Sequence, residues 1–147
     1  MKQILIPLIL FSTSLNAQYI GVGISNKGAC FYAGIVSEGI EVGIAHKVPL
    51  FSQETPTITS LQVGRAILLT NYDEDNYSIT PSVGIAHYKV KDFKDFDNGG
   101  DIIEIAEVKP LFNLELSKDA YMGRMFLSAT FCKTVYYSIG MKVFFNR

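Results

Sequence analysis

The feature that most constrains the fold is an alternation of apolar with small or polar residues, repeated at a period of two through most of the chain. In segment 40–47 the two sides differ in kind: Ile40, Val42, Ile44 and His46 against Glu41, Gly43, Ala45 and Lys47. Successive side chains of a β-strand point to opposite faces, so this period predicts strands with one apolar face. After residue 17, apolar residues do not keep a helical spacing for more than a turn or two. The sequence therefore predicts an all-β fold.

Turn-forming residues divide the alternating sequence into eight predicted strands. The intervening segments are rich in Gly, Pro, Asn, Asp and Ser, the residues that supply turns. Most of the strands run to about ten residues, which a tilted strand needs to cross a membrane's hydrocarbon layer and which exceeds the usual length in soluble proteins. The predicted strands are residues 18–26, 29–37, 40–47, 58–69, 78–90, 102–116, 119–132 and 135–145.

The first 17 residues have the layout of a secretory signal peptide. Lys2 precedes an apolar run over residues 4–11, and small and polar residues follow up to Ala17. The run is shorter than the roughly 20 residues that a transmembrane helix needs. We therefore expect cleavage after Ala17, with residues 1–17 as signal peptide and residues 18–147 as one mature domain.

Charge and cysteine content narrow the partners and the compartment. The chain has 13 Lys and Arg against 14 Asp and Glu, and cleavage would remove Lys2, leaving 12 − 14 = −2. A protein with this slightly negative net charge has no electrostatic attraction that would favour binding to nucleic acid. Cys30 and Cys132 would enter an oxidising compartment. In a closed barrel of these strands, however, three strand spacings separate them, more than the roughly 7 Å between Cα atoms that a disulfide allows, so we favour free or interface-buried thiols.

The polar side of the strands predicts the interior of a narrow barrel. Glycine and other small residues recur there beside isolated charges of both signs, as expected where side chains pack inside a small barrel. The charges would pair across the interior and give a polar plug in place of a wide pore. The predicted lumen charge network consists of Glu41, Lys47, Glu107, Lys109, Glu115, Arg124 and Lys142.

In these features the chain resembles the small eight-stranded outer-membrane barrels of the OmpA/OmpX type. The resemblance covers residues 18–147 and lies in the leader ending in NAQ, in glycine-spaced strands such as YIGVGIS, and in the last strand YYSIGMKVFF. It implies a closed antiparallel up-and-down transmembrane β-barrel in a Gram-negative outer membrane. It also implies contact with membrane lipid and with the barrel assembly machinery, which would recognise the last strand through Tyr137, Phe144 and Phe145.

The pentapeptide VGIAH occurs twice, at residues 42–46 and 83–87, and contains both histidines. Both fall on the apolar side with one strand between them, so we expect them on the order of 10 Å apart, too far to share a zinc ion. Tyr88 and Lys89 follow His87, which departs from the HxS arrangement of outer-membrane lipid deacylases. We expect no catalytic residues, no metal and no cofactor.

The predicted loop over residues 91–101 is the candidate contact surface, because Phe93 and Phe96 stand there among charged residues. We expect a monomeric, non-enzymatic outer-membrane protein with a structural or surface-interaction role and an extracellular partner of unknown identity. Two alternatives stay open: a soluble secreted β-barrel that binds a small apolar ligand, and a lipid-modifying outer-membrane enzyme.

Arg65 conflicts with this assignment of faces. It falls on the apolar side near the middle of the predicted strand 58–69, where exposure to lipid would cost roughly 2 to 4 kcal/mol. Either a β-bulge turns it inward or the assignment of faces is wrong.

Overall fold

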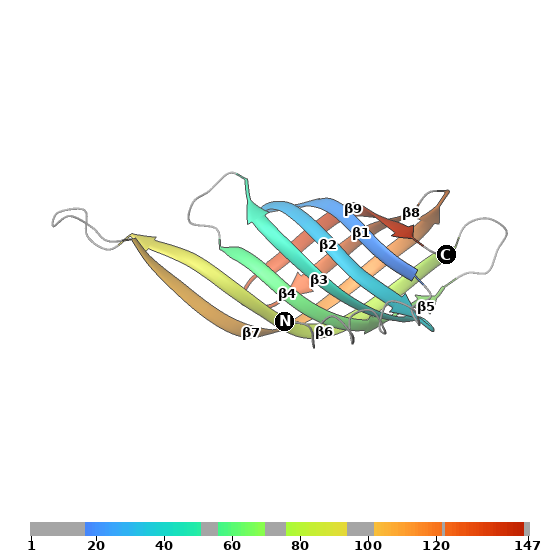
Figure 1. Cartoon of the computed structure of the whole chain (residues 1–147), viewed down its shortest axis with the longest axis horizontal. Helices are drawn as coiled ribbons and strands as arrows, with labels where there is room; N and C mark the ends of the chain where they lie inside the picture. The colour runs from blue at the N-terminus through green and yellow to red at the C-terminus, as the bar shows by residue number, and fades with distance from the viewer. Residues whose placement is uncertain (1–16, 51–55, 70–75, 94–101, 122, 146–147) are drawn as a thin grey trace, which may run out of the picture.

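The computed structural model describes residues 17–50, 56–69, 76–93, 102–121 and 123–145, whose strands form one closed antiparallel barrel (Figure 1). Residues 1–16, which contain most of the predicted signal peptide, lie outside this part of the chain. Within it, no helix is long and apolar enough to cross a membrane.

Each strand pairs antiparallel with its neighbours along the chain, and β1 pairs with β9 to close the barrel. β4 and β5 both pair with β6 and together make one interrupted strand, so the barrel has the eight strands that the sequence predicts. The bounds are β1 Ala17–Ser25, β2 Gly28–Ser37, β3 Ile40–Pro49, β4 Thr57–Arg65, β5 Ile67–Leu68, β6 Tyr77–Phe93, β7 Ile102–Ala120, β8 Gly123–Phe131 and β9 Val135–Phe145.

The interruption between β4 and β5 lies opposite Pro81. Gly64 pairs with Ser82 and Ile67 with Ile79, three residues further along each strand, so the register is unchanged and no bulge is present. Proline has no backbone N–H to donate, which accounts for the break in the ladder.

Arg65 therefore keeps the outward orientation that the alternation gives it, and its side chain is exposed. It pairs with Ile40, the first residue of β3. The predicted mid-strand position was wrong, because Arg65 lies close to one end of the barrel. The assignment of faces stands.

Register fixes how far the strands are staggered around the barrel. The paired residues in one row are Gln18, Ile35, Val42, Val63, Val83, Phe112, Phe131 and Val135. The β9–β1 pairing closes the row. If this pairing is extended to Val135, its partner is position 28, whereas the row began at Gln18. One circuit of the barrel therefore shifts the row by ten residues along the chain (28 − 18). This stagger and the number of strands together set the tilt of the strands and the width of the interior.

The two ends of the barrel differ. The terminal end holds Ala17, Phe145 and the turn at residues 37–40, whereas the hairpin end holds the turns at 25–28 and 131–135. β6 and β7 pair with each other as far as Phe93 and Ile102. Their outer neighbours stop earlier, since β4 pairs with β6 only to Lys89 and β8 with β7 only to Phe112. The β6–β7 hairpin consequently projects beyond the hairpin end, at the left of Figure 1.

The backbone conformation of the turn Glu38–Gly39, between β2 and β3, can be tested by substitution. Both residues have positive φ, 51° and 79°, as a two-residue hairpin turn that matches strand twist requires. A non-glycine residue in this region costs roughly 1 to 2 kcal/mol, less for asparagine. We expect Glu38→Asn to stabilise the barrel by up to about 1 kcal/mol and Gly39→Val to destabilise it by at least about 1 kcal/mol, measured by urea unfolding followed by circular dichroism.

Glu38→Gln is the control for this turn, because it removes the charge and leaves the backbone preference nearly unchanged. Equal stabilisation by Glu38→Asn and Glu38→Gln would show that charge, and not φ, governs the turn.

Candidate functional site

A buried ammonium group organises the interior of the barrel. Lys142 on β9 is 1% exposed, and its Nζ donates to Glu41 Oε1 at 2.6 Å and to both Glu115 oxygens at 2.8 and 2.9 Å. Glu41 lies on β3 and Glu115 on β7. The Glu41–Lys142–Glu115 cluster therefore joins three strands that are far apart in the sequence.

Aromatic rings complete the surroundings of the ammonium. The Tyr19 hydroxyl donates to Glu41 Oε1 at 2.7 Å. Lys142 Nζ lies 4.8 Å from the centre of the Tyr19 ring and 5.4 Å from that of Phe126, within reach of cation–π attraction. Tyr19 occupies space that side chains at Gly34 and Gly43 would fill, because a Cβ at either glycine would collide with the Tyr19 hydroxyl.

The remaining predicted lumen charges divide into separate contacts. Arg124 Nε donates to Asp119 Oδ1 at 2.9 Å, a partner that the sequence analysis did not single out. Lys47 is buried and donates to Thr130 Oγ1 at 3.1 Å, with its Nζ 4.9 Å from the centre of the Tyr136 ring. It forms no salt bridge with any side chain that the structure describes.

Glu107 and Lys109 lie outside the lumen network to which the sequence analysis assigned them. Their side chains are 37% and 45% exposed, and the Glu107 carboxylate lies 3.5 Å from Lys109 and 3.4 Å from Lys133. Both follow the inward alternation of β7, but they precede Phe112, where pairing with β8 begins, so no opposite wall faces them. The alternation in the sequence held no signal of this, because it does not show where β8 ends. The ammonium groups of Lys109 and then Lys133 hold the pKa of the Glu107 carboxyl below its usual value.

Side chains leave little space beside the charge cluster. A cavity of about 10 Å³ lies there, which is room for roughly one water molecule. It is lined by Glu41, Gln62, Gly64, Thr80, Ser82, Asn113 and Glu115.

The two histidines point outward on neighbouring parts of the wall. Thr59 pairs with both His46 and His87, so it lies between them, and His46 Nδ1 is 2.9 Å from Thr59 Oγ1. No group of three or more His, Cys, Asp or Glu side chains suited to a metal ion occurs in the described ranges.

The cysteines and the predicted contact and assembly residues lie in different places. Cys30 is buried, Cys132 is half-buried, and both are free thiols.

Tyr137 and Phe145 are exposed on the outer face, whereas Phe144 packs against Tyr19 with ring centres 5.5 Å apart. The side chain of Phe93 and the whole of Phe96 fall outside the residues that can be described.

No protein-family model and no curated protein matches the sequence. Solved structures with a similar fold include the N-terminal β-barrel domain of Pseudomonas aeruginosa OprF, with a TM-score of 0.56 and 12% identity over 89% of this chain and 97% of that one. Neisserial surface protein A (NspA) has a TM-score of 0.51 and 6% identity over 89% and 95%. A designed transmembrane β-barrel has a TM-score of 0.50 and 11% identity over 90% and 96%. At these identities the likeness shows a common fold and leaves function to the chain's own residues.

The charge cluster predicts a large effect of removing its ammonium group. We expect Lys142→Met to destabilise the barrel by about 3 to 5 kcal/mol, because two buried carboxylates then face each other without compensation. Adding Glu115→Gln should recover part of that loss. Urea unfolding would measure both variants.

Lys109→Met is the matched control, since it removes an exposed ammonium group and should change stability by less than about 1 kcal/mol. Similar losses from Lys142→Met and Lys109→Met would contradict a special role for the buried cluster.

Proposed function

We propose that this chain is an integral outer-membrane β-barrel protein without enzymatic activity, which has a structural or surface-interaction role and a lumen plugged by polar side chains. The observation that carries the proposal is the apolar outer face of the barrel. The other observations bear on which end faces the outside and on the two alternative functions.

Large apolar side chains cover the outer face on every side of the barrel. Soluble monomers rarely expose contiguous apolar patches larger than a few hundred Å², so lipid is the better solvent for this surface. A closed ladder also leaves no unpaired strand edge within a membrane, where a free edge is not tolerated. The exposed residues include Ile20, Val22, Ile24, Ile44, Leu61, Val63, Val83, Ile85, Phe112, Leu114, Leu127, Ile139 and Met141.

A soluble barrel that binds a small apolar ligand requires an apolar interior, and the observed distribution is the reverse. Ile44, Val83 and Ile85 are more than half exposed on the outside. The interior contains the Lys142 ammonium group with its two carboxylates. This distribution argues against the apolar-ligand alternative.

A lipid-modifying enzyme would need a histidine within hydrogen-bond reach of a nucleophile. Of the described serines, Ser60, Ser82 and Ser128 are buried inside the barrel. His46 and His87 lie on the outward side of strands β3 and β6. The wall separates these serines from the histidines. The hydroxyl that His46 does contact is that of Thr59, and no carboxylate among the described residues orients this histidine, which favours the non-enzymatic proposal.

The projecting β6–β7 hairpin supports the surface-interaction part of the proposal. It extends from the hairpin end, opposite the end that holds Ala17 and Phe145. If the chain starts in the periplasm, the described part of the hairpin, as far as Phe93 and Ile102, extends outside the cell. Phe93 and Phe96 are the residues that we propose to contact the extracellular partner.

If the barrel inserts into a membrane, the loss of stability caused by a charge on its outer face should depend strongly on the depth of that charge in the bilayer. We expect Ile139→Arg to destabilise the barrel folded in phosphatidylcholine vesicles by about 2 to 4 kcal/mol, since Ile139 lies within the apolar band. Gln18→Arg, at the terminal end of the same face, should cost about 1 kcal/mol or less. Urea unfolding in vesicles would give both values.

Cell fractionation tests the proposed membrane location independently. The protein should appear in the outer-membrane fraction and require detergent for extraction. Recovery from the periplasm or medium without detergent, together with little effect of Ile139→Arg, would contradict it.

The orientation of the hairpin is tested by epitope insertion. We expect an epitope inserted between Asn98 and Gly99 to bind antibody on intact cells, because the β6–β7 hairpin would face outward. The matched epitope inserted between Glu38 and Gly39, in the turn at the terminal end, should bind only after the outer membrane is permeabilised. Labelling of the second site on intact cells would show the reverse orientation.

The contact role of the hairpin is measured on the same cells. Phe93→Ser with Phe96→Ser should weaken binding to a panel of purified extracellular surface proteins and glycans, whereas Tyr121→Ser, at the terminal end, should not. Unchanged binding to every member of the panel would contradict the surface-interaction role, and only the structural role would remain.

A further inference from the structure

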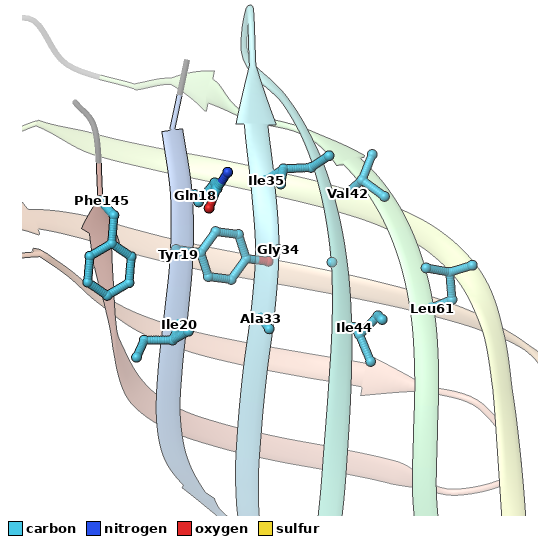
Figure 2. A pocket seen from close by; sticks show the side chains of 11 residues that line it. Gln18, Tyr19, Ile20, Ala33, Gly34, Ile35, Val42, Ile44, Leu61 and Phe145 are labelled. Carbon is cyan, nitrogen blue, oxygen red and sulfur yellow. The ribbon is translucent and has the colours of Figure 1, made fainter. Parts of the chain in front are cut away.

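A groove of about 470 Å³ crosses the outer face of β1, β2, β3 and β4 near the terminal end (Figure 2). Ala33 and Gly34 of β2 lie along its middle in Figure 2, with Ile20 and Phe145 to one side and Ile44 and Leu61 to the other. The remaining lining residues are Gln18, Tyr19, Ile35, Val42 and Gly43.

The groove arises from one small residue in a row of large ones. Register places Ile20, Ala33, Ile44 and Leu61 side by side on four consecutive strands. Ala33 contributes a single methyl group where each neighbour contributes a branched four-carbon side chain. The outer surface is therefore hollowed at β2, and no other side chain of the row can reach across to fill the gap.

Gln18 gives the groove a polar end. It is the outward-facing residue of β1 nearest the chain terminus, and it pairs with Phe145 of β9. Every other outward side chain along the groove is apolar, and none of its lining residues is charged. The groove thus combines a long hydrocarbon surface with the side-chain amide of Gln18, which can donate a hydrogen bond to an ester or phosphate oxygen. Cleavage after Ala17 would also leave the α-amino group of Gln18 at this end.

We propose that this groove binds one acyl chain of a phospholipid, with the headgroup at Gln18. The inference rests on the membrane location proposed above and adds a defined lipid site to it. The groove is continuous with the apolar outer face, so its surroundings in a membrane are hydrocarbon. Within lipid the gain comes from van der Waals packing and not from water release. A groove one side chain deep favours an acyl chain because it offers contact on several sides, where the rest of the wall offers contact on one.

Photo-crosslinking locates the bound chain. The barrel would be folded in phosphatidylethanolamine vesicles that contain a small fraction of phosphatidylethanolamine with a diazirine on one acyl chain. Crosslinked peptides would then be mapped by mass spectrometry. We expect crosslinks at residues 33–44 to exceed those at residues 125–139 by several-fold. The second segment is the β8–β9 hairpin, whose exposed side chains include Met125, Leu127 and Ile139.

Two variants make the test specific to the groove. Ala33→Leu fills it and should reduce crosslinking at residues 33–44 several-fold, to the level of the rest of the wall. Ala129→Leu enlarges another outward-facing alanine, which pairs with Leu114 and Tyr137 away from the groove, and should leave the pattern unchanged. Circular dichroism of both variants confirms that they are folded.

The outcomes separate this site from the membrane proposal. Equal crosslinking around the whole wall, unchanged by Ala33→Leu, would overturn the lipid site and leave the membrane location intact. A dimer of the folded barrel that Ala33→Leu dissociates, measured by size-exclusion chromatography in detergent, would also overturn it and assign the groove to a second copy of the chain. Absence of lipid crosslinks on any part of a folded barrel would overturn both proposals.

Discussion

Closure of the hydrogen-bond ladder between β1 and β9 is the constraint on which the rest of the structure depends. Once the sheet is closed, each side chain in the wall points either into a narrow interior or away from the barrel, and no strand edge is left at the seam. A slip of one residue in any pairing would exchange the two faces of that strand. The period-two pattern of the sequence is therefore a requirement of closure as much as a propensity of single strands.

The buried charge cluster reinforces the same register. Glu41, Glu115 and Lys142 come from β3, β7 and β9, and burying any one of them alone would be strongly unfavourable. Only the observed register brings all three to the same depth. Ion pairs of this kind add little net stability compared with a well-packed apolar interior, so we interpret the cluster as a device that disfavours wrong registers.

Local patterns predicted most of the wall, because alternation and turn residues act over a few positions. They gave the eight strands and the inward placement of Lys142. Features that depend on where neighbouring strands end were not accessible in the same way. The parity of Glu107 and Lys109 was right, yet it does not reveal that β8 has already ended at their level. Arg65 was placed at mid-strand for the same reason.

The groove at Ala33 belongs to this second kind of feature. An alanine in an alternating strand has no special meaning until the residues beside it are known, and those come from β1, β3 and β4. Sequence alone predicted that Val42 and Ile44 face outward, but the row that contains Ile20, Ala33 and Leu61 requires the full register. The candidate lipid site is thus a property of the assembled wall.

The projecting hairpin follows different rules from the wall, because β7 loses its partner β8 beyond Phe112. The exposed stretch carries Lys109 and Pro110 near this unpaired edge, and lysine and proline are residues that natural edge strands use to discourage pairing with another chain. Glu107 of the same stretch also forms ion pairs with Lys109 and Lys133. An edge protected in this way is poorly suited to adding a partner's strand. Recognition by the hairpin would therefore rely on side-chain contacts, for which Phe93 and Phe96 are the proposed residues, in place of strand addition.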